Sequence, residues 1–156
     1  MTQSTSRFGG MTATPIQTAS LAFGVVFLLV GILGFVPGIT TNSGDLMVAG
    51  HESGAMLFGL FQVSILHNLV HLAFGVAGLV CARAAGTSRA FLVWVGAVYA
   101  VLWIYGLVVP HDSTANFVPL NTADNWLHFV LAAAMIGLGI VLSRNRARST
   151  THANLA

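Results

Sequence analysis

Polar side chains that can ligate metals or hold hydrogen bonds recur with one spacing at two places in an otherwise apolar chain. The first place carries His67, Asn68 and His71, and the second, 57 residues further on, carries Asp124, Asn125 and His128. Residues four apart lie on one face of a helix, one turn from each other. If the two helices pack together, three histidines, two asparagines and an aspartate meet at one point.

Three kinds of chemistry fit such a cluster. The first is a divalent transition metal held by His67, His71 and His128 with Asp124 as a fourth ligand, while Asn68 and Asn125 hold the imidazole rings by hydrogen bonds. The second is haem, with axial histidines from the two helices. The third is purely structural, because Asn and His join neighbouring transmembrane helices through hydrogen bonds of about 0.6–2 kcal/mol each. The structural role is the commonest for such residues, and it is favoured here.

Several classes of function are excluded by the sequence. The His67-x-x-x-His71 pair lacks the glutamate of the H-E-x-x-H motif, so a metalloprotease is excluded. A G-x-S-x-G element is absent, and no Ser/His/Asp spacing of a nucleophilic enzyme is found. The charge pattern shows no basic stripe with interleaved aromatics, which excludes nucleic acid as a partner. No enzymatic activity is therefore predicted.

The elements that position these residues are membrane helices. The chain has 156 residues, of which 56% are hydrophobic and 6% charged, whereas soluble domains carry about 25% charged residues. Four apolar segments divide it: 18–36, 63–82, 90–109 and 125–143. About 20 residues at a rise of 1.5 Å cross the roughly 30 Å hydrocarbon core of a bilayer. The sequence therefore predicts an all-α, multi-pass protein of the cell (inner or plasma) membrane, surrounded by lipid.

The charges predict how the helices are oriented. All six basic residues lie at the same ends of the segments: Arg7, Arg83, Arg89, Arg144, Arg146 and Arg148. All four acidic residues lie at the opposite ends: Asp45, Glu52, Asp112 and Asp124. Basic residues near membrane helices stay in the cytoplasm. We expect an up-down bundle of four helices with both termini cytoplasmic, divided into a disordered tail 1–17, a membrane domain 18–144 and a tail 145–156.

The long connection 38–62 leaves the start of the second helix open. The apolar stretch 54–61 either extends this helix to about 30 residues, too long for a bilayer without strong tilt, or forms a short interfacial segment. The second alternative is preferred and starts the helix near Val63, with Gln62 and Ser64 as helix-start residues. Asp124 or Asn125 is expected to cap the fourth helix.

The polar groups also predict an internal repeat. Both contain Asn-x-x-His, and each follows a helix that ends at proline, Pro37 or Pro110. Both polar helices run from the outer to the inner side. The chain is therefore expected to consist of two hairpins of the same orientation, related by an axis along the membrane normal.

The stretch 63–75, with its His67-Asn68-x-x-His71 element, together with Asp124-Asn125-x-x-His128, resembles a family of four-helix bacterial integral membrane proteins. This family is mostly actinobacterial and is catalogued as a domain of unknown function. The resemblance covers about residues 18–144 and implies membrane residence and four helices, but no activity. We expect a non-enzymatic accessory or assembling membrane subunit, in a homo-oligomer or a larger membrane complex. The alternative is a metal- or haem-binding membrane protein that uses the His/Asn/Asp cluster near the outer surface.

Overall fold

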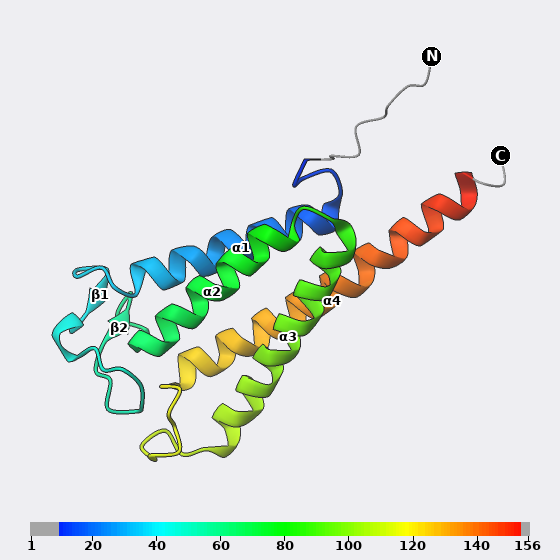
Figure 1. Ribbon diagram of the computed structural model, residues 1–156. Helices are drawn as coiled ribbons and strands as arrows, with labels where there is room; N and C mark the ends of the chain where they lie inside the picture. Colours follow the sequence, from blue (N-terminus) through cyan, green and yellow to red (C-terminus); the bar gives the residue numbers. More distant parts are fainter. Residues whose placement is uncertain (1–9, 154–156) are drawn as a thin grey trace.

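Four helices account for most of the chain. The computed structural model describes the backbone of residues 10–153 and the side chains of residues 10–143. The helices are α1 (Pro15–Leu33), α2 (Ile65–Cys81), α3 (Ala85–Val108) and α4 (Thr122–Ala153). At one end of the molecule α1 and α3 finish and α2 and α4 begin, next to a small sheet (Figure 1). The predicted all-α class is confirmed.

The helix ends differ from those expected. Helix α1 starts at Pro15, three residues before the predicted segment, because proline fits the first turn, where no backbone N–H is needed. Helix α4 continues to Ala153, past the predicted end at Ser143. The predicted tails 1–17 and 145–156 fall partly on residues 1–9 and 154–156, which lie outside the described residues.

Among the described residues, three helices are long and apolar enough to cross a membrane: Pro15–Leu33, Ala85–Val108 and Thr122–Ser143, of 19, 24 and 22 residues. Helix α2 is apolar but has only 17 residues, the lower limit for a span. Ser64 caps its first turn, so the helix starts at Ile65, two residues after the predicted start. These helices, with the composition, are those of a membrane protein.

The connection between α1 and α2 folds into a three-stranded antiparallel sheet of β1 (Thr40–Thr41), β2 (Met56–Leu57) and β3 (Phe61–Gln62), with a short 3₁₀ turn at Ser43–Asp45. The apolar stretch 54–61 is thus part of the sheet and its turn rather than an extension of α2. The structure agrees with the preferred alternative, in which the second helix starts close to Val63.

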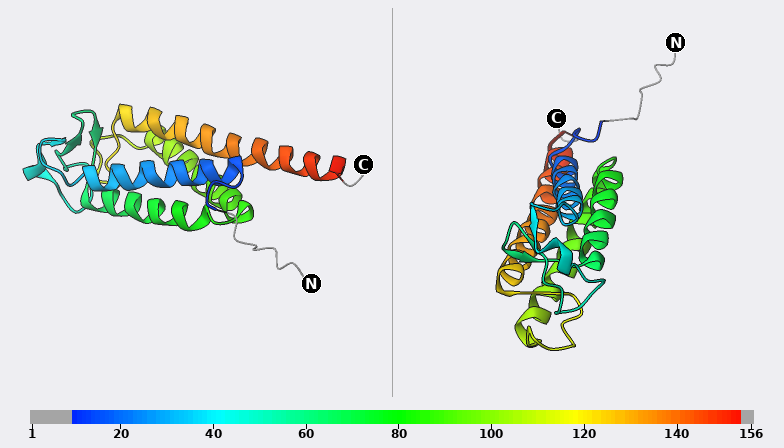
Figure 2. Two further views of the ribbon diagram at one scale, coloured as in Figure 1. Left: turned by 90° about the horizontal axis from the view of Figure 1, so that it is seen from above. Right: turned by 90° about the vertical axis from the view of Figure 1, so that its left-hand side faces the viewer.

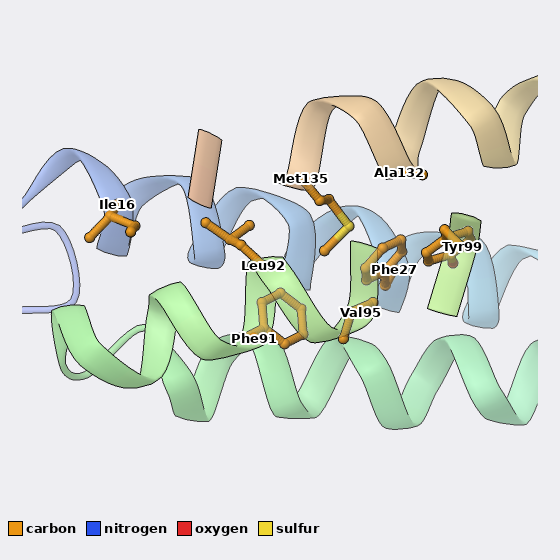
Figure 3. Close-up of a cluster of buried hydrophobic side chains, with 8 residues drawn as sticks. All are labelled: Ile16, Phe27, Phe91, Leu92, Val95, Tyr99, Ala132 and Met135. Atoms are coloured by element: carbon orange, nitrogen blue, oxygen red, sulfur yellow. The ribbon is translucent and has the colours of Figure 1, made fainter. Parts of the chain in front are cut away.

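The helices pack in two pairs. Helix α1 lies along α2, and α3 lies along α4, with fewer contacts between the pairs (Figure 2). A core of buried side chains joins the pairs: Ile16, Phe27, Phe91, Leu92, Val95, Tyr99, Ala132 and Met135 (Figure 3). Within it the rings of Phe27 and Tyr99 stack, with centroids 5.5 Å apart and planes 15° apart. This stack lies next to the polar cluster.

Candidate functional site

Two helix caps fix the polar residues at the starts of α2 and α4. Ser64 caps α2, and its Oγ accepts a hydrogen bond of 3.1 Å from the His67 N–H. At α4 the Asp124 N–H donates to Asn121 Oδ1 at 2.9 Å, and the Asn121 N–H donates to Asp124 Oδ2 at 3.1 Å. This reciprocal pair is a capping box. The expectation that Asp124 or Asn125 caps α4 is therefore wrong, since Asn121 does so.

His71 connects the two helix pairs. Its Nδ1 lies 2.9 Å from the carbonyl oxygen of His67, and its Nε2 lies 3.0 Å from the hydroxyl of Tyr99 on α3. A carbonyl oxygen can only accept, so Nδ1 carries the ring proton and Nε2 accepts the proton of the Tyr99 hydroxyl. Both residues are buried. Each polar atom of the link is therefore satisfied away from lipid and water.

His67 packs directly on His71, with ring centroids 4.1 Å apart. Its Nδ1 lies 3.3 Å from Oδ1 of the fully buried Asn68. An amide oxygen is also only an acceptor, so Nδ1 is the protonated nitrogen and Nε2 keeps its lone pair. His67 thus presents an acceptor on the side away from Asn68.

The ring of His128 carries a buried nitrogen without a hydrogen-bond partner among the described residues. This ring lies 5.1 Å from that of Tyr99 and is only 3% exposed. Among the described residues, its Nδ1 has no hydrogen-bond partner, and the same holds for Asn125 Oδ1 and Asn68 Nδ2. A buried polar atom without a partner costs about 1–3 kcal/mol, so these atoms need an explanation.

The fourth predicted ligand, Asp124, already accepts hydrogen bonds through one of its two carboxylate oxygens. It is 3% exposed, and its Oδ2 accepts hydrogen bonds from the backbone N–H groups of Asn121 and of Gln62, the latter at 3.0 Å. The Gln62 bond joins the sheet to α4. Asp124 therefore holds the connections before α2 and α4 onto the start of α4.

The four predicted metal ligands share one space. The side chains of His67, His71, Asp124 and His128 all line a cavity of about 90 Å³ between α1 and α4, here called the α1–α4 cavity. Even so, within residues 10–143 no group of three or more His, Cys, Asp or Glu side chains is arranged to hold a metal ion. The reason is visible for His71, whose two nitrogens are both engaged.

A larger cavity of about 210 Å³ lies on the other side of the histidines, between α2 and α3. It is called the α2–α3 cavity, and its wall is almost entirely apolar, although His67, His71, Tyr99 and His128 are among its lining residues. Ser64, apolar side chains of α2 and α3, and Phe117 and Val118 of the connection between α3 and α4 form the rest. Pockets for drug-sized ligands occupy roughly 300–1,000 Å³, so this cavity is too small for a haem macrocycle.

Tyr99 is the site residue that the sequence prediction missed. Trp94 and Tyr99 lie equally far from the two ends of α3, but Trp94 is 73% exposed, whereas Tyr99 is only 1% exposed. A tyrosine hydroxyl within an apolar segment needs a buried hydrogen-bond partner. The tyrosine hydroxyl within an apolar segment was therefore the signal in the sequence that could have identified Tyr99 as a partner of the histidines.

Comparison with known protein families gives one match. A family described as Domain of unknown function (DUF4383) matches residues 17–141. This range contains all six residues of the polar cluster. It covers α2 and α3 completely, α1 almost completely, and α4 as far as residue 141. Comparisons with curated proteins and with solved structures each give no match.

Proposed function

The chain belongs to this family of unknown function, and we propose that it is a multi-pass protein of the cell membrane with four spans and cytoplasmic termini. The arginines Arg83 and Arg89 flank the short turn between α2 and α3, whereas Asp45, Glu52 and Asp112 lie in the connections at the other end. The positive-inside rule then places the sheet and the polar cluster near the outer surface. In this orientation the helices form an up-down bundle.

The packing supports two repeated hairpins. A Cβ atom at Gly24 of α1 would lie 2.9 Å from the backbone nitrogen of Leu79, and one at Gly96 of α3 would lie 2.8 Å from Ile136. Gly96 follows Gly24 by 72 residues, and Ile136 follows Leu79 by the same 57 residues that separate His71 from His128. A close approach within each helix pair therefore falls at corresponding positions.

The outer ends of the pairs correspond as well. A Cβ atom at Gly34 would overlap the Asn68 side chain, and one at Gly106 would overlap the Asn125 side chain. Gly106 again follows Gly34 by 72 residues. The same two offsets thus relate both contacts, which supports a parallel duplication about an axis along the membrane normal.

For the polar cluster we propose a non-enzymatic role that fastens the two hairpins together within an accessory or assembling membrane subunit. The observation that carries this proposal is the buried bond between the Tyr99 hydroxyl of the second hairpin and His71 Nε2 of the first, 3.0 Å long. Such bonds stabilise helix association where lipid offers no competing partner. Homo-oligomers or larger membrane complexes are the proposed setting.

A transition metal on His67, His71, His128 and Asp124 is the second candidate. The unpartnered Nδ1 of the buried His128, next to the other three side chains in the α1–α4 cavity, favours it. Against it, a metal on His71 requires that a ring nitrogen give up its bond to Tyr99 or to the His67 carbonyl. The fastening role needs no such change.

The orientation is tested with reporter fusions. A cytoplasm-active reporter fused after Arg148 should be active, and one inserted at Gly44 in the outer connection should be inactive, because the arginines keep their helix ends in the cytoplasm. A periplasm-active reporter inserted at the same two positions should give the reverse pattern. Periplasmic activity after Arg148 would overturn the four-span orientation.

A further inference from the structure

The connection between α1 and α2 changes from polar to apolar along its length. Asp45 and Glu52 lie in its first part, whereas the stretch 54–61, which includes β2 and the turn to β3, contains no charged residue. Two large side chains of this turn are mostly outside the protein, because Phe58 is 61% exposed and Leu60 is 52% exposed. Turns that face water are dominated by Gly, Pro, Asn, Asp and Ser, so these two side chains indicate a different surrounding.

The backbone of the turn holds Phe58 in a strained conformation. Its φ of 55° lies in the left-handed region, which is unusual for a bulky side chain. The next residue, Gly59, has a φ of 68°, which glycine adopts without strain. A strained backbone persists only where the surrounding structure determines it, and such residues gather at functional places. The exposed position of the Phe58 ring is therefore set by the fold.

The N–H groups of the turn have partners within the protein. Those of Phe58, Gly59 and Leu60 donate to backbone carbonyl oxygens at 2.9, 3.1 and 3.1 Å. In addition, the Asn121 side-chain amide donates to the carbonyl oxygen of Leu60 at 2.9 Å. A backbone next to hydrocarbon must find its hydrogen bonds inside the protein, because water is scarce there. The donors of this turn meet that requirement.

The ring of Phe58 adjoins the outer surfaces of two apolar helices. It lines the α1–α4 cavity together with Val26 and Val30 of α1 and Leu127 of α4. Both helices are long and apolar enough to cross a membrane. Val26 is 46% exposed and Leu127 is 36% exposed, so these side chains face lipid in the proposed membrane arrangement. The Phe58 ring continues this apolar surface.

From these observations we propose that the β2–β3 turn is a lipid contact, with the side chains of Phe58 and Leu60 among the acyl chains at the outer boundary of the bilayer. The outer leaflet is the partner, because the turn is uncharged and continues the lipid-facing surface of α1 and α4. Aromatic and apolar side chains are typical of this boundary. The contact rests on the proposed orientation, in which the sheet lies on the outer side.

Spin labels at three positions test the contact. Each variant carries one new cysteine in the Cys81→Ala background, and the labelled chain is placed in lipid nanodiscs. Collisions of the nitroxide are measured with oxygen, which concentrates in hydrocarbon, and with a nickel chelate, which stays in water. The substitutions are Phe58→Cys in the turn, Val130→Cys on α4 as the lipid reference and Gly44→Cys as the aqueous reference.

The two reference positions are suited to a label. Val130 is 57% exposed on an apolar helix. Gly44 is exposed in the same connection as Phe58, and a Cβ atom there meets nothing within 4 Å. We expect the oxygen-to-nickel collision ratio at Phe58 to exceed that at Gly44 by nearly the same factor as the ratio at Val130 does.

The other outcomes overturn the proposal in distinguishable ways. A ratio at Phe58 like that at Gly44 means that the turn lies in water. Few collisions with either reagent at Phe58 mean that another protein surface covers the turn. In both cases a lipid-like ratio at Val130 leaves the membrane arrangement standing, whereas a water-like ratio at Val130 refutes that arrangement and the contact with it.

Phe58→Asn tests the ring without a label. Asparagine tolerates the left-handed φ, so this substitution relieves the strain while it removes the apolar ring. With the ring in lipid, the midpoint of thermal unfolding in nanodiscs should fall by at least about 2 °C, whereas Gly44→Asn should leave it unchanged. An unchanged or raised midpoint for Phe58→Asn, as expected for a strained ring in water, would contradict the contact.

Discussion

Removing one hydroxyl group tests the link between the two hairpins. Tyr99→Phe keeps the ring that stacks on Phe27 but deletes the donor to His71 Nε2. Because His71 is only 7% exposed, water cannot easily replace that donor. Leaving the acceptor unpaired should lower the free energy of unfolding by about 1–2 kcal/mol, within the range for buried and intramembrane bonds. This equals a roughly 5–30-fold shift in the unfolding equilibrium.

The proposed duplication supplies a matched partner for this variant. Phe27 occupies the position that corresponds to Tyr99, and it lines the α1–α4 cavity together with His128, which corresponds to His71. That cavity of about 90 Å³ has room for one oxygen atom. The double variant Phe27→Tyr/Tyr99→Phe moves the hydroxyl from α3 to α1. Its free energy of unfolding should be about 1 kcal/mol higher than that of Tyr99→Phe.

The assay is equilibrium unfolding in mixed micelles of a mild and a denaturing detergent, followed by tryptophan fluorescence. Phe27→Tyr alone is the control for the added hydroxyl. If Tyr99→Phe changes stability by less than about 0.3 kcal/mol, which is within the usual error of such comparisons, the bond does not fasten the hairpins. A double variant less stable than Tyr99→Phe would instead refute the correspondence between Phe27 and Tyr99.

Two further groups of substitutions probe the contacts that position the cluster. Gly34→Ala and Gly106→Ala should each destabilise the protein by about 1–3 kcal/mol in the same assay, because the added methyl overlaps a buried asparagine, whereas Gly86→Ala, with nothing within 4 Å, should not destabilise it. Asn121→Ala should cost about 1 kcal/mol through loss of the cap on α4, and Asn121→Ser, which restores a capping oxygen, should recover most of it. Equal effects of Gly86→Ala and Gly34→Ala, or of Ala and Ser at Asn121, would contradict these assignments.

Much of the fold follows from local signals in the sequence. Apolar runs of about 20 residues, ended by Pro37 and Pro110, predict the helices because a bilayer requires that length and proline interrupts a helix. The spacing of four between His67 and His71 places both on one face of α2, and the structure finds both lining the same cavities. These features depend on residues close together in the chain.

The remainder depends on contacts between distant residues. Tyr99 could not be assigned to His71 because an apolar membrane helix carries no hydrophobic periodicity that tells which face turns inward. The short strands in the connection 38–62 are held to α4 by a remote bond, from the Gln62 N–H to Asp124 Oδ2, at 3.0 Å. Helix α4 is capped by Asn121, which exchanges two hydrogen bonds with Asp124. Since Asn121, Asp124 and Asn125 are all residue types that cap helices, residue type alone does not tell which of them does so.

The most direct test of the fastening role is the metal content and visible absorbance of the purified protein. We expect a colourless protein with substoichiometric metal, because both ring nitrogens of His71 are hydrogen-bonded, one to the His67 carbonyl and the other to the Tyr99 hydroxyl. In that case His67→Ala/His71→Ala/His128→Ala should lose stability without losing any bound group. One metal per chain, or a Soret band, that disappears in this triple variant would contradict the fastening role and establish the histidines as ligands.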